Sequence, residues 1–218
     1  LVMLLSLFII LPLIVGVFML LMPGQKPQRW LGAFVGGALL AVYLFITCKG
    51  GNDGLTYQTQ WFNFNNVKTY FALNAQGLGG LMILLSNLTY LALFVYLSTT
   101  KQKYNNTFYG LLLITLAGLN GVFLAEDLIL FYFFWEVVLI PVYFLIGLYG
   151  IGKDKIRANM TFFLYTILGS MFMLGGIIYI GFFLQPASFL LAFKIASKII
   201  NKITAIITYS IFITSIII

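Results

Sequence analysis

One acidic residue, Glu136, lies where the local sequence offers it no water. It is the ninth residue of an apolar run, 128–149, and its neighbours read FYFFWEVV. At about 1.5 Å per residue, its carboxyl group would lie about 12 Å along a helix of roughly 33 Å. Inserting an ionisable group at that depth costs at least about 2.5–3.5 kcal/mol, and such residues commonly act in ion pathways or proton relays. The sequence therefore predicts a proton-transferring carboxyl group. The simpler alternative is a Glu held by one interhelical hydrogen bond.

A proline close to this glutamate strengthens the prediction. Pro141 has no N–H to donate to the carbonyl group of Val137, and its ring should bend the helix one turn beyond Glu136. A freed carbonyl group beside a carboxyl group gives water a position to bind within the membrane. Tyr132 and Tyr143 flank the same stretch and could extend a hydrogen-bonded chain, or simply pack against neighbouring helices.

The other acids have ordinary explanations. Asp53 and Asp154 lie in predicted loops, whereas Glu126 and Asp127 open the fifth apolar run. Acids favour a helix N-terminus because its first N–H groups are unpaired. The sixth run carries polar groups that fit either a hydrated path or interhelical hydrogen bonds. These groups are Asn159, Thr161, Thr166 and Ser170.

The elements that must position these groups are membrane spans. Of the 218 residues, 62% are hydrophobic and 8% are charged, and the mean hydropathy is +1.06. Soluble domains average about 45–50% apolar and about 25% charged residues. This composition excludes a soluble domain, a disordered chain and a nucleic-acid-binding protein. Because the chain has one cysteine, Cys48, and no histidine, we expect no metal site and no cofactor site in it.

Six apolar runs are long enough to cross a bilayer, which takes about 20 residues. They are 1–22, 30–48, about 73–97, 108–125, 128–149 and 160–184. We therefore predict an all-α, polytopic transmembrane helix bundle that forms a single membrane domain over residues 1–218. Residues 50–70 are too polar to span and are predicted to form an interfacial loop, where Trp and Tyr collect.

The tail, residues 186–218, is divergent, basic and apolar. Lys194, Lys198 and Lys202 are four residues apart, so a helix would place them on one face. The pattern fits an interfacial basic helix before a short span at 203–218, or the start of a seventh span. Lipids are an expected partner of the whole chain.

The positive charges predict the orientation. Only Lys49 and Lys68 follow the second and fourth runs, whereas seven cations follow the first, third and fifth. Those seven are Lys26, Arg29, Lys101, Lys103, Lys153, Lys155 and Arg157. Because Lys and Arg accumulate in loops on the cytoplasmic side, that side is predicted to be cytoplasmic or matrix-facing, and the N-terminus to face the other way.

Two segments carry a family resemblance. Residues 126–150 read EDLILFYFFWEVVLIPVYFLIGLYG, and residues 71–89 read FALNAQGLGGLMILLSNLT. The first closely resembles the fifth-helix signature of the antiporter-like subunit of NADH–quinone oxidoreductase (respiratory complex I), called chain M or chain 4. The second is similar to the family's third-helix entry, with Gln76 where the family usually has Asp. The resemblance extends over roughly 1–184.

The resemblance implies proton translocation by a non-redox subunit of a proton-translocating NADH:ubiquinone reductase. NADH, FMN, iron–sulfur clusters and quinone would be bound by partner subunits, in a mitochondrial inner membrane or a bacterial cytoplasmic membrane. Glu136 matches the family glutamate that pairs with a lysine on the seventh helix. The family's sequence context for that lysine is absent here, so Lys198 in the tail is only a candidate partner.

The family subunits have many more helices than this chain. We therefore expect an amino-terminal portion whose partners are other membrane-arm subunits, including a chain that supplies the missing carboxy-terminal helices. Three alternatives remain open: a subunit of a multi-subunit Na⁺/H⁺ antiporter, a membrane-bound hydrogenase subunit, or a structural remnant of the arm that does not pump.

Overall fold

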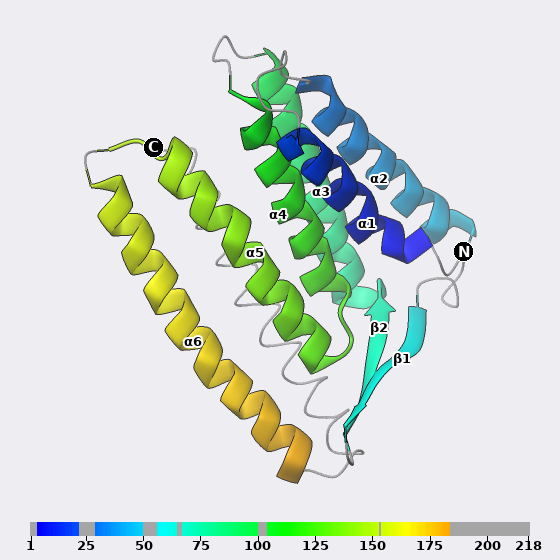
Figure 1. The fold of residues 1–218 in the computed structure, drawn as a ribbon. Helices are drawn as coiled ribbons and strands as arrows, with labels where there is room; N and C mark the ends of the chain where they lie inside the picture. Colours follow the sequence, from blue (N-terminus) through cyan, green and yellow to red (C-terminus); the bar gives the residue numbers. More distant parts are fainter. Residues whose placement is uncertain are drawn as a thin grey trace.

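The computed structural model describes residues 4–21, 29–49, 56–64, 67–99, 104–152 and 154–183. Their helices lie side by side, with one hairpin at an end of the bundle (Figure 1). The elements are α1 (Leu4–Leu21), α2 (Arg29–Lys49), β1 (Thr56–Phe64), β2 (Val67–Asn74), α3 (Gly77–Thr99), α4 (Asn106–Leu124), α5 (Leu128–Tyr149) and α6 (Lys155–Phe183). All six helices are long and apolar enough to cross a membrane. The predicted six-span α-helical bundle is confirmed. The basic tail, with Lys198 and the candidate seventh span, lies outside the described residues.

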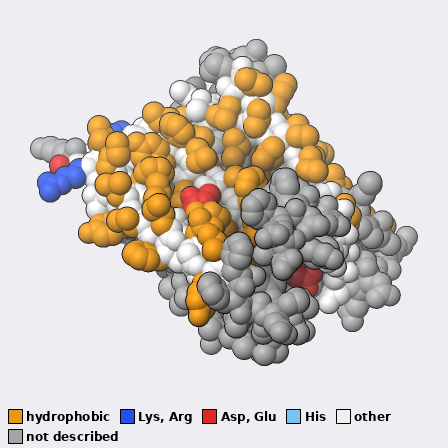
Figure 2. Space-filling model, turned by 60° about the horizontal axis from the view of Figure 1, so that its bottom comes forward, with side chains coloured by type: hydrophobic (Ala, Val, Ile, Leu, Met, Phe, Trp, Pro, Cys, Tyr) orange, Lys and Arg blue, Asp and Glu red, His pale blue; other side chains and the backbone are white. Residues whose placement is uncertain are grey.

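The outside of the bundle is apolar. Seen from the hairpin end, hydrophobic side chains cover most of the described surface, and charged side chains are few (Figure 2). Large side chains such as Phe172 and Leu21 are 82% and 75% exposed. Soluble proteins rarely expose contiguous apolar surface on this scale. The outer surface is therefore suited to contact with lipid or with other membrane helices.

The centre of the bundle is α4. It contacts α1, α2, α3, α5 and β2, and 72% of its span is buried, compared with 11% in α6. The crossing of α1 and α4 is close because two glycines meet there. A Cβ atom on Gly16 would lie 2.9 Å from the carbonyl oxygen of Gly110, and one on Gly110 would lie 2.8 Å from that of Gly16. Small residues allow helix backbones to approach this closely.

A proline inside α1 leaves one carbonyl group without its helical hydrogen bond, and a side chain of α4 supplies the donor. Pro12 has no N–H for the carbonyl oxygen of Phe8, one turn earlier in the helix. The side-chain Nδ2 of Asn120 in α4 donates to that oxygen at 3.0 Å. The Oδ1 of Asn120 accepts from Ser86 at 3.0 Å and from Asn87 at 3.1 Å, both in α3. One buried amide therefore connects three helices.

The segment predicted as an interfacial loop, 50–70, instead contributes most of a β-hairpin. β1 and β2 pair antiparallel from Thr56 opposite Asn74 to Phe64 opposite Val67. The segment is rich in aromatic residues and threonine, which favour strands. Because β2 continues to Asn74, α3 begins at Gly77 and not near residue 73 as predicted. Gly77 has φ +57°, a left-handed conformation that glycine adopts readily at this change from strand to helix.

The hairpin is attached to the turn between α4 and α5. The N–H of Glu126 donates to the carbonyl oxygen of Ala72 at 2.9 Å, and Leu73 and Ala125 form an isolated bridge. The side chain of Asn74 donates to Glu126 Oε1 at 3.3 Å. Glu126 therefore holds the hairpin against the bundle.

Asp127 caps the next helix, as its position predicts. Its Oδ1 accepts hydrogen bonds from the N–H groups of Ile129 at 2.8 Å and Leu130 at 3.3 Å. These bonds satisfy two of the unpaired N–H groups at the start of α5. The cap and the hairpin contact together set where α5 begins, and so the depth of every residue along it.

We predict that Asn120→Leu destabilises the bundle by about 1–3 kcal/mol, since it leaves buried polar groups on α1 and α3 without a partner. The matched control is Thr115→Val in the same helix. Thr115 is also buried, but its hydroxyl donates only within α4, to Leu111 at 2.8 Å. Thermal unfolding of the assembled protein should show a clearly larger loss for Asn120→Leu. Equal losses would mean that the amide does not connect the helices energetically.

Candidate functional site

Glu136 is the only Asp, Glu, Lys or Arg located away from the ends of the described helices. Its side chain is partly buried, and Oε1 is fully buried with no hydrogen-bond partner among the described residues. Buried polar atoms are normally paired, because leaving one unpaired is costly. Within the described part of the chain, no interhelical hydrogen bond occupies this oxygen, so its unpaired state calls for a functional explanation.

Tyr132 lies beside Glu136. The two residues are four apart on one face of α5, where side chains meet, and Tyr132 interacts with both the Glu136 carboxyl group and the Ser170 hydroxyl of α6. Ser170 is buried and can also donate to the carbonyl oxygen of Ile167, at 2.9 Å. The three side chains form a polar line across the α5–α6 contact. Ser170 therefore connects α6 to the Glu136 site.

Tyr143 lies on the same face of α5 but at a different depth. Seven residues separate it from Glu136, which is close to two helical turns and about 10 Å along the axis. Its hydroxyl donates to Met160 Sδ at 3.7 Å, and its ring lies 4.9 Å from that of Phe163. The structure therefore does not bring the side chains of Tyr143 and Glu136 together.

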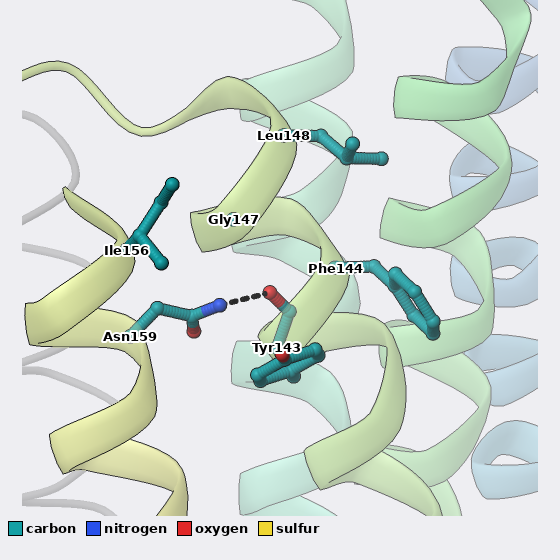
Figure 3. A pocket seen from close by; sticks show the side chains of 6 residues that line it. All are labelled: Tyr143, Phe144, Gly147, Leu148, Ile156 and Asn159. Atoms are coloured by element: carbon teal, nitrogen blue, oxygen red, sulfur yellow. Dashed lines mark hydrogen bonds between the residues drawn. The ribbon is translucent and has the colours of Figure 1, made fainter.

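A groove lies between α5 and α6 at the level of Tyr143 (Figure 3). It has a volume of about 260 Å³ and is lined by Tyr143, Phe144, Gly147, Leu148, Ile156 and Asn159. Asn159 is 3% exposed, and its Nδ2 donates to the carbonyl oxygen of Tyr143 at 3.0 Å. Its Oδ1 is buried and has no partner among the described residues.

Pro141 is buried within α5, which continues through it from Leu128 to Tyr149. Because proline lacks an N–H, the carbonyl group of Val137 has lost its usual partner in the helix. That carbonyl lies between the depths of Glu136 and Tyr143. The helix therefore carries a polar backbone atom between the carboxyl group and the groove.

The polar residues of α6 have different roles, which the sequence did not distinguish. The hydroxyls of Thr161 and Thr166 donate to their own helix, to Arg157 at 2.8 Å and Phe162 at 2.7 Å. Such bonding within a helix is common for Thr and needs no function. Asn159 bonds across to α5, and Ser170 reaches Tyr132. The register of α6 against α5 decides that Asn159 and Ser170 reach α5, whereas the two threonines do not.

Within the described ranges, no three His, Cys, Asp or Glu side chains gather as a metal site would require. What the fold and site define is a polytopic membrane protein with a single carboxyl group deep in its spans. Residues 125–218 match the family model described as "NADH:quinone oxidoreductase/Mrp antiporter, TM". This match includes all of α5 and α6, and so the whole Glu136 site.

Individual relatives agree with the family model. The chain is 36% identical over 177 residues to NAD(P)H-quinone oxidoreductase chain 4, chloroplastic, of Adiantum capillus-veneris, covering 78% of this chain and 35% of the relative. It is 35% identical over 167 residues to NADH-quinone oxidoreductase subunit M of Escherichia coli (strain K12), covering 69% and 32%. In a solved structure of the Mrp complex from Dietzia sp. DQ12-45-1b, one chain superposes with a TM-score of 0.64 at 25% identity, covering 81% of this chain and 33% of that one.

The resemblance to chain M and chain 4 is therefore confirmed, and residues 125–218 carry the transmembrane domain of the NADH:quinone oxidoreductase/Mrp antiporter family. The chain spans about a third of the length of the curated relatives it matches. These relatives are subunits of enzyme complexes, as their names state.

We predict that Tyr132→Phe changes the hydrogen bonding of Glu136, whereas Tyr143→Phe does not, because only Tyr132 interacts with the carboxyl group. Both substitutions remove one hydroxyl from the same face of α5, so they are matched. The infrared C=O stretching band of the protonated Glu136 carboxyl, assigned with Glu136→Gln, should shift only in Tyr132→Phe. An unchanged band would show that the two side chains do not bond.

Proposed function

We propose that this chain takes part in proton translocation as a membrane-arm subunit of NADH:quinone oxidoreductase, coupled to electron transfer from NADH to quinone. One observation supports this above the others: a single carboxyl group deep in the spans, with a buried and unpaired Oε1, on the helix that matches the family. A group of this kind can accept a proton, hold it away from bulk water and release it.

In the proposed step, Glu136 carries the proton on its carboxyl group. A cation that approaches would stabilise the carboxylate, and the proton would then be released. Tyr132 can donate to the carboxylate and so hold it in position during this exchange.

The proposed step also requires a cation close to Glu136. Lys198 is the candidate in this chain and lies outside the described residues, and a lysine from a neighbouring subunit would serve equally. Other membrane-arm subunits, including one that supplies further helices, are the proposed partners. NADH, FMN, iron–sulfur clusters and quinone would be bound elsewhere in the complex. This chain then contributes no redox step of its own.

We predict that Glu136→Gln leaves the complex assembled but lowers proton translocation, because Gln has nearly the same shape and cannot release a proton. The expected reduction is about 100-fold, which is the smaller end of the range that a positioned acid–base group contributes. The measurement is proton uptake into sealed vesicles during NADH oxidation, with complex content measured in parallel.

The control is Glu126→Gln, which alters an exposed acid at the hairpin contact, outside the spans. It should translocate protons at the normal rate. Normal translocation in Glu136→Gln would reject the proposal and favour a structural remnant. Copurification separates the remaining alternatives: flavin and iron–sulfur partners with NADH activity indicate the proposed complex. Their absence indicates an antiporter, and nickel indicates a hydrogenase.

A further inference from the structure

One buried polar atom has no part in the site around Glu136. Asn159 is almost fully buried, yet only its Nδ2 has a partner, the carbonyl oxygen of Tyr143. Its Oδ1 is enclosed and accepts no hydrogen bond from the described residues. An unsatisfied amide oxygen costs about 1–3 kcal/mol. Since Asn159 also lines the groove between α5 and α6 (Figure 3), the groove is where a donor can reach it.

The chemistry of the groove selects the kind of donor. Its walls include Phe144, Leu148 and Ile156, which give a polar organic ligand little to bond. Lys155 and Arg157 lie at the same end of α6, and Lys155 Nζ donates to the carbonyl oxygen of Leu148 at 3.4 Å. These cations disfavour a metal ion in the groove, because like charges repel. A small neutral donor, water, fits this combination.

Water would have enough partners there. The carbonyl groups in the last turn of a helix have no N–H partners within it, and the groove lies against the last turn of α5 at Gly147, whose carbonyl group is one of them. Asn159 Oδ1 adds a second kind of acceptor. A volume of about 260 Å³ holds several water molecules, each of which takes about 30 Å³.

The position of the groove along α5 relates it to Glu136. Tyr143 and Glu136 share one face of α5, about 10 Å apart along its axis. The carbonyl group of Val137, left free by Pro141, lies between them. At about 2.8 Å per hydrogen bond, about three further water molecules would join water at Asn159 to the carboxyl group. The groove is at the end of the bundle where α6 begins with Lys155 and Arg157, the end with the predicted excess of positive charge.

We propose that Asn159 and the α5–α6 groove form a water-binding site through which protons reach Glu136 from the positively charged side of the membrane. The inference deepens the proposed function and rests on it for the role of Glu136. Asn159 acts here as a positioning residue: it holds water, and it does not itself gain or lose a proton.

The first test measures hydration of the groove by thiol labelling, without reference to transport. Phe144→Cys places a thiol in the groove wall, and Thr161→Cys places one at a similar depth on α6 outside the lining. Both are made in the assembled complex with Cys48→Ser, which removes the one cysteine within these 218 residues. The probe is a membrane-impermeant, anionic methanethiosulfonate added from the positively charged side. Because only a thiolate reacts and hydrocarbon suppresses its formation, Phe144→Cys should be labelled at least about tenfold faster than Thr161→Cys.

The second test asks whether changes in the groove alter proton uptake. Asn159→Leu has a similar volume but no acceptor, and Ile156→Trp fills the groove while keeping the bond between Asn159 and Tyr143. Each should slow the labelling of Phe144→Cys and lower proton uptake during NADH oxidation, with complex content unchanged. Using both variants guards against a folding defect in either one.

The outcomes separate this inference from the proposed function. Equal labelling of Phe144→Cys and Thr161→Cys would overturn the water site. Normal proton uptake in assembled Asn159→Leu and Ile156→Trp would overturn its role as an entrance, even if Glu136→Gln remains defective. If Glu136→Gln pumps normally, the proposed function fails, and labelling still decides whether the groove holds water.

Discussion

The arrangement of the helices depends on one buried amide in α4. Asn120 donates to the carbonyl oxygen that Pro12 leaves free in α1, and it accepts from Ser86 and Asn87 in α3. A hydrogen bond in an apolar interior is strong because no water competes for its atoms, and breaking it leaves costly unpaired groups. The amide therefore fixes how α1 and α3 are placed around α4, the most buried helix of the described bundle.

Placement of α4 in turn divides α5 into two faces. One face packs on α4, where Phe134 lies against Gly121, and it includes the buried Leu130 and Phe131. The other face is turned to α6 and carries Tyr132 and Glu136. Since α6 packs mainly on α5, the polar side chains of these two helices can meet without disturbing the apolar core. The proposed proton site is thus located at the edge of the buried part of the bundle.

Much of this could be predicted, for a simple reason. A bilayer allows a backbone to cross it only when its polar groups are paired within the segment, so long apolar runs must become helices. The six spans and the depth of Glu136 along α5 follow from that rule. The start of α3 does not, because residues 73 and 74 adjoin the apolar run that follows and so resemble the beginning of a span. Pairing with β1 made them a strand instead, and a pairing partner cannot be identified from hydropathy alone.

The sequence by itself determined which residue is out of place in a membrane, and that residue is Glu136, because an ionisable side chain in the middle of a long apolar run can be recognised from position and composition. It also determined that Asp127 would cap α5, since a cap is a local feature of the chain. Only the tertiary structure decided that Asn159 and Ser170 face α5 while Thr161 and Thr166 bond within their own helix. It likewise decided that Asn120 donates a hydrogen bond to the carbonyl oxygen of Phe8 in α1, more than a hundred residues away in the chain. Both contacts depend on which helices become neighbours and on the register between them. Helical periodicity places a residue on one face of its helix, but it does not identify the helix that packs against that face.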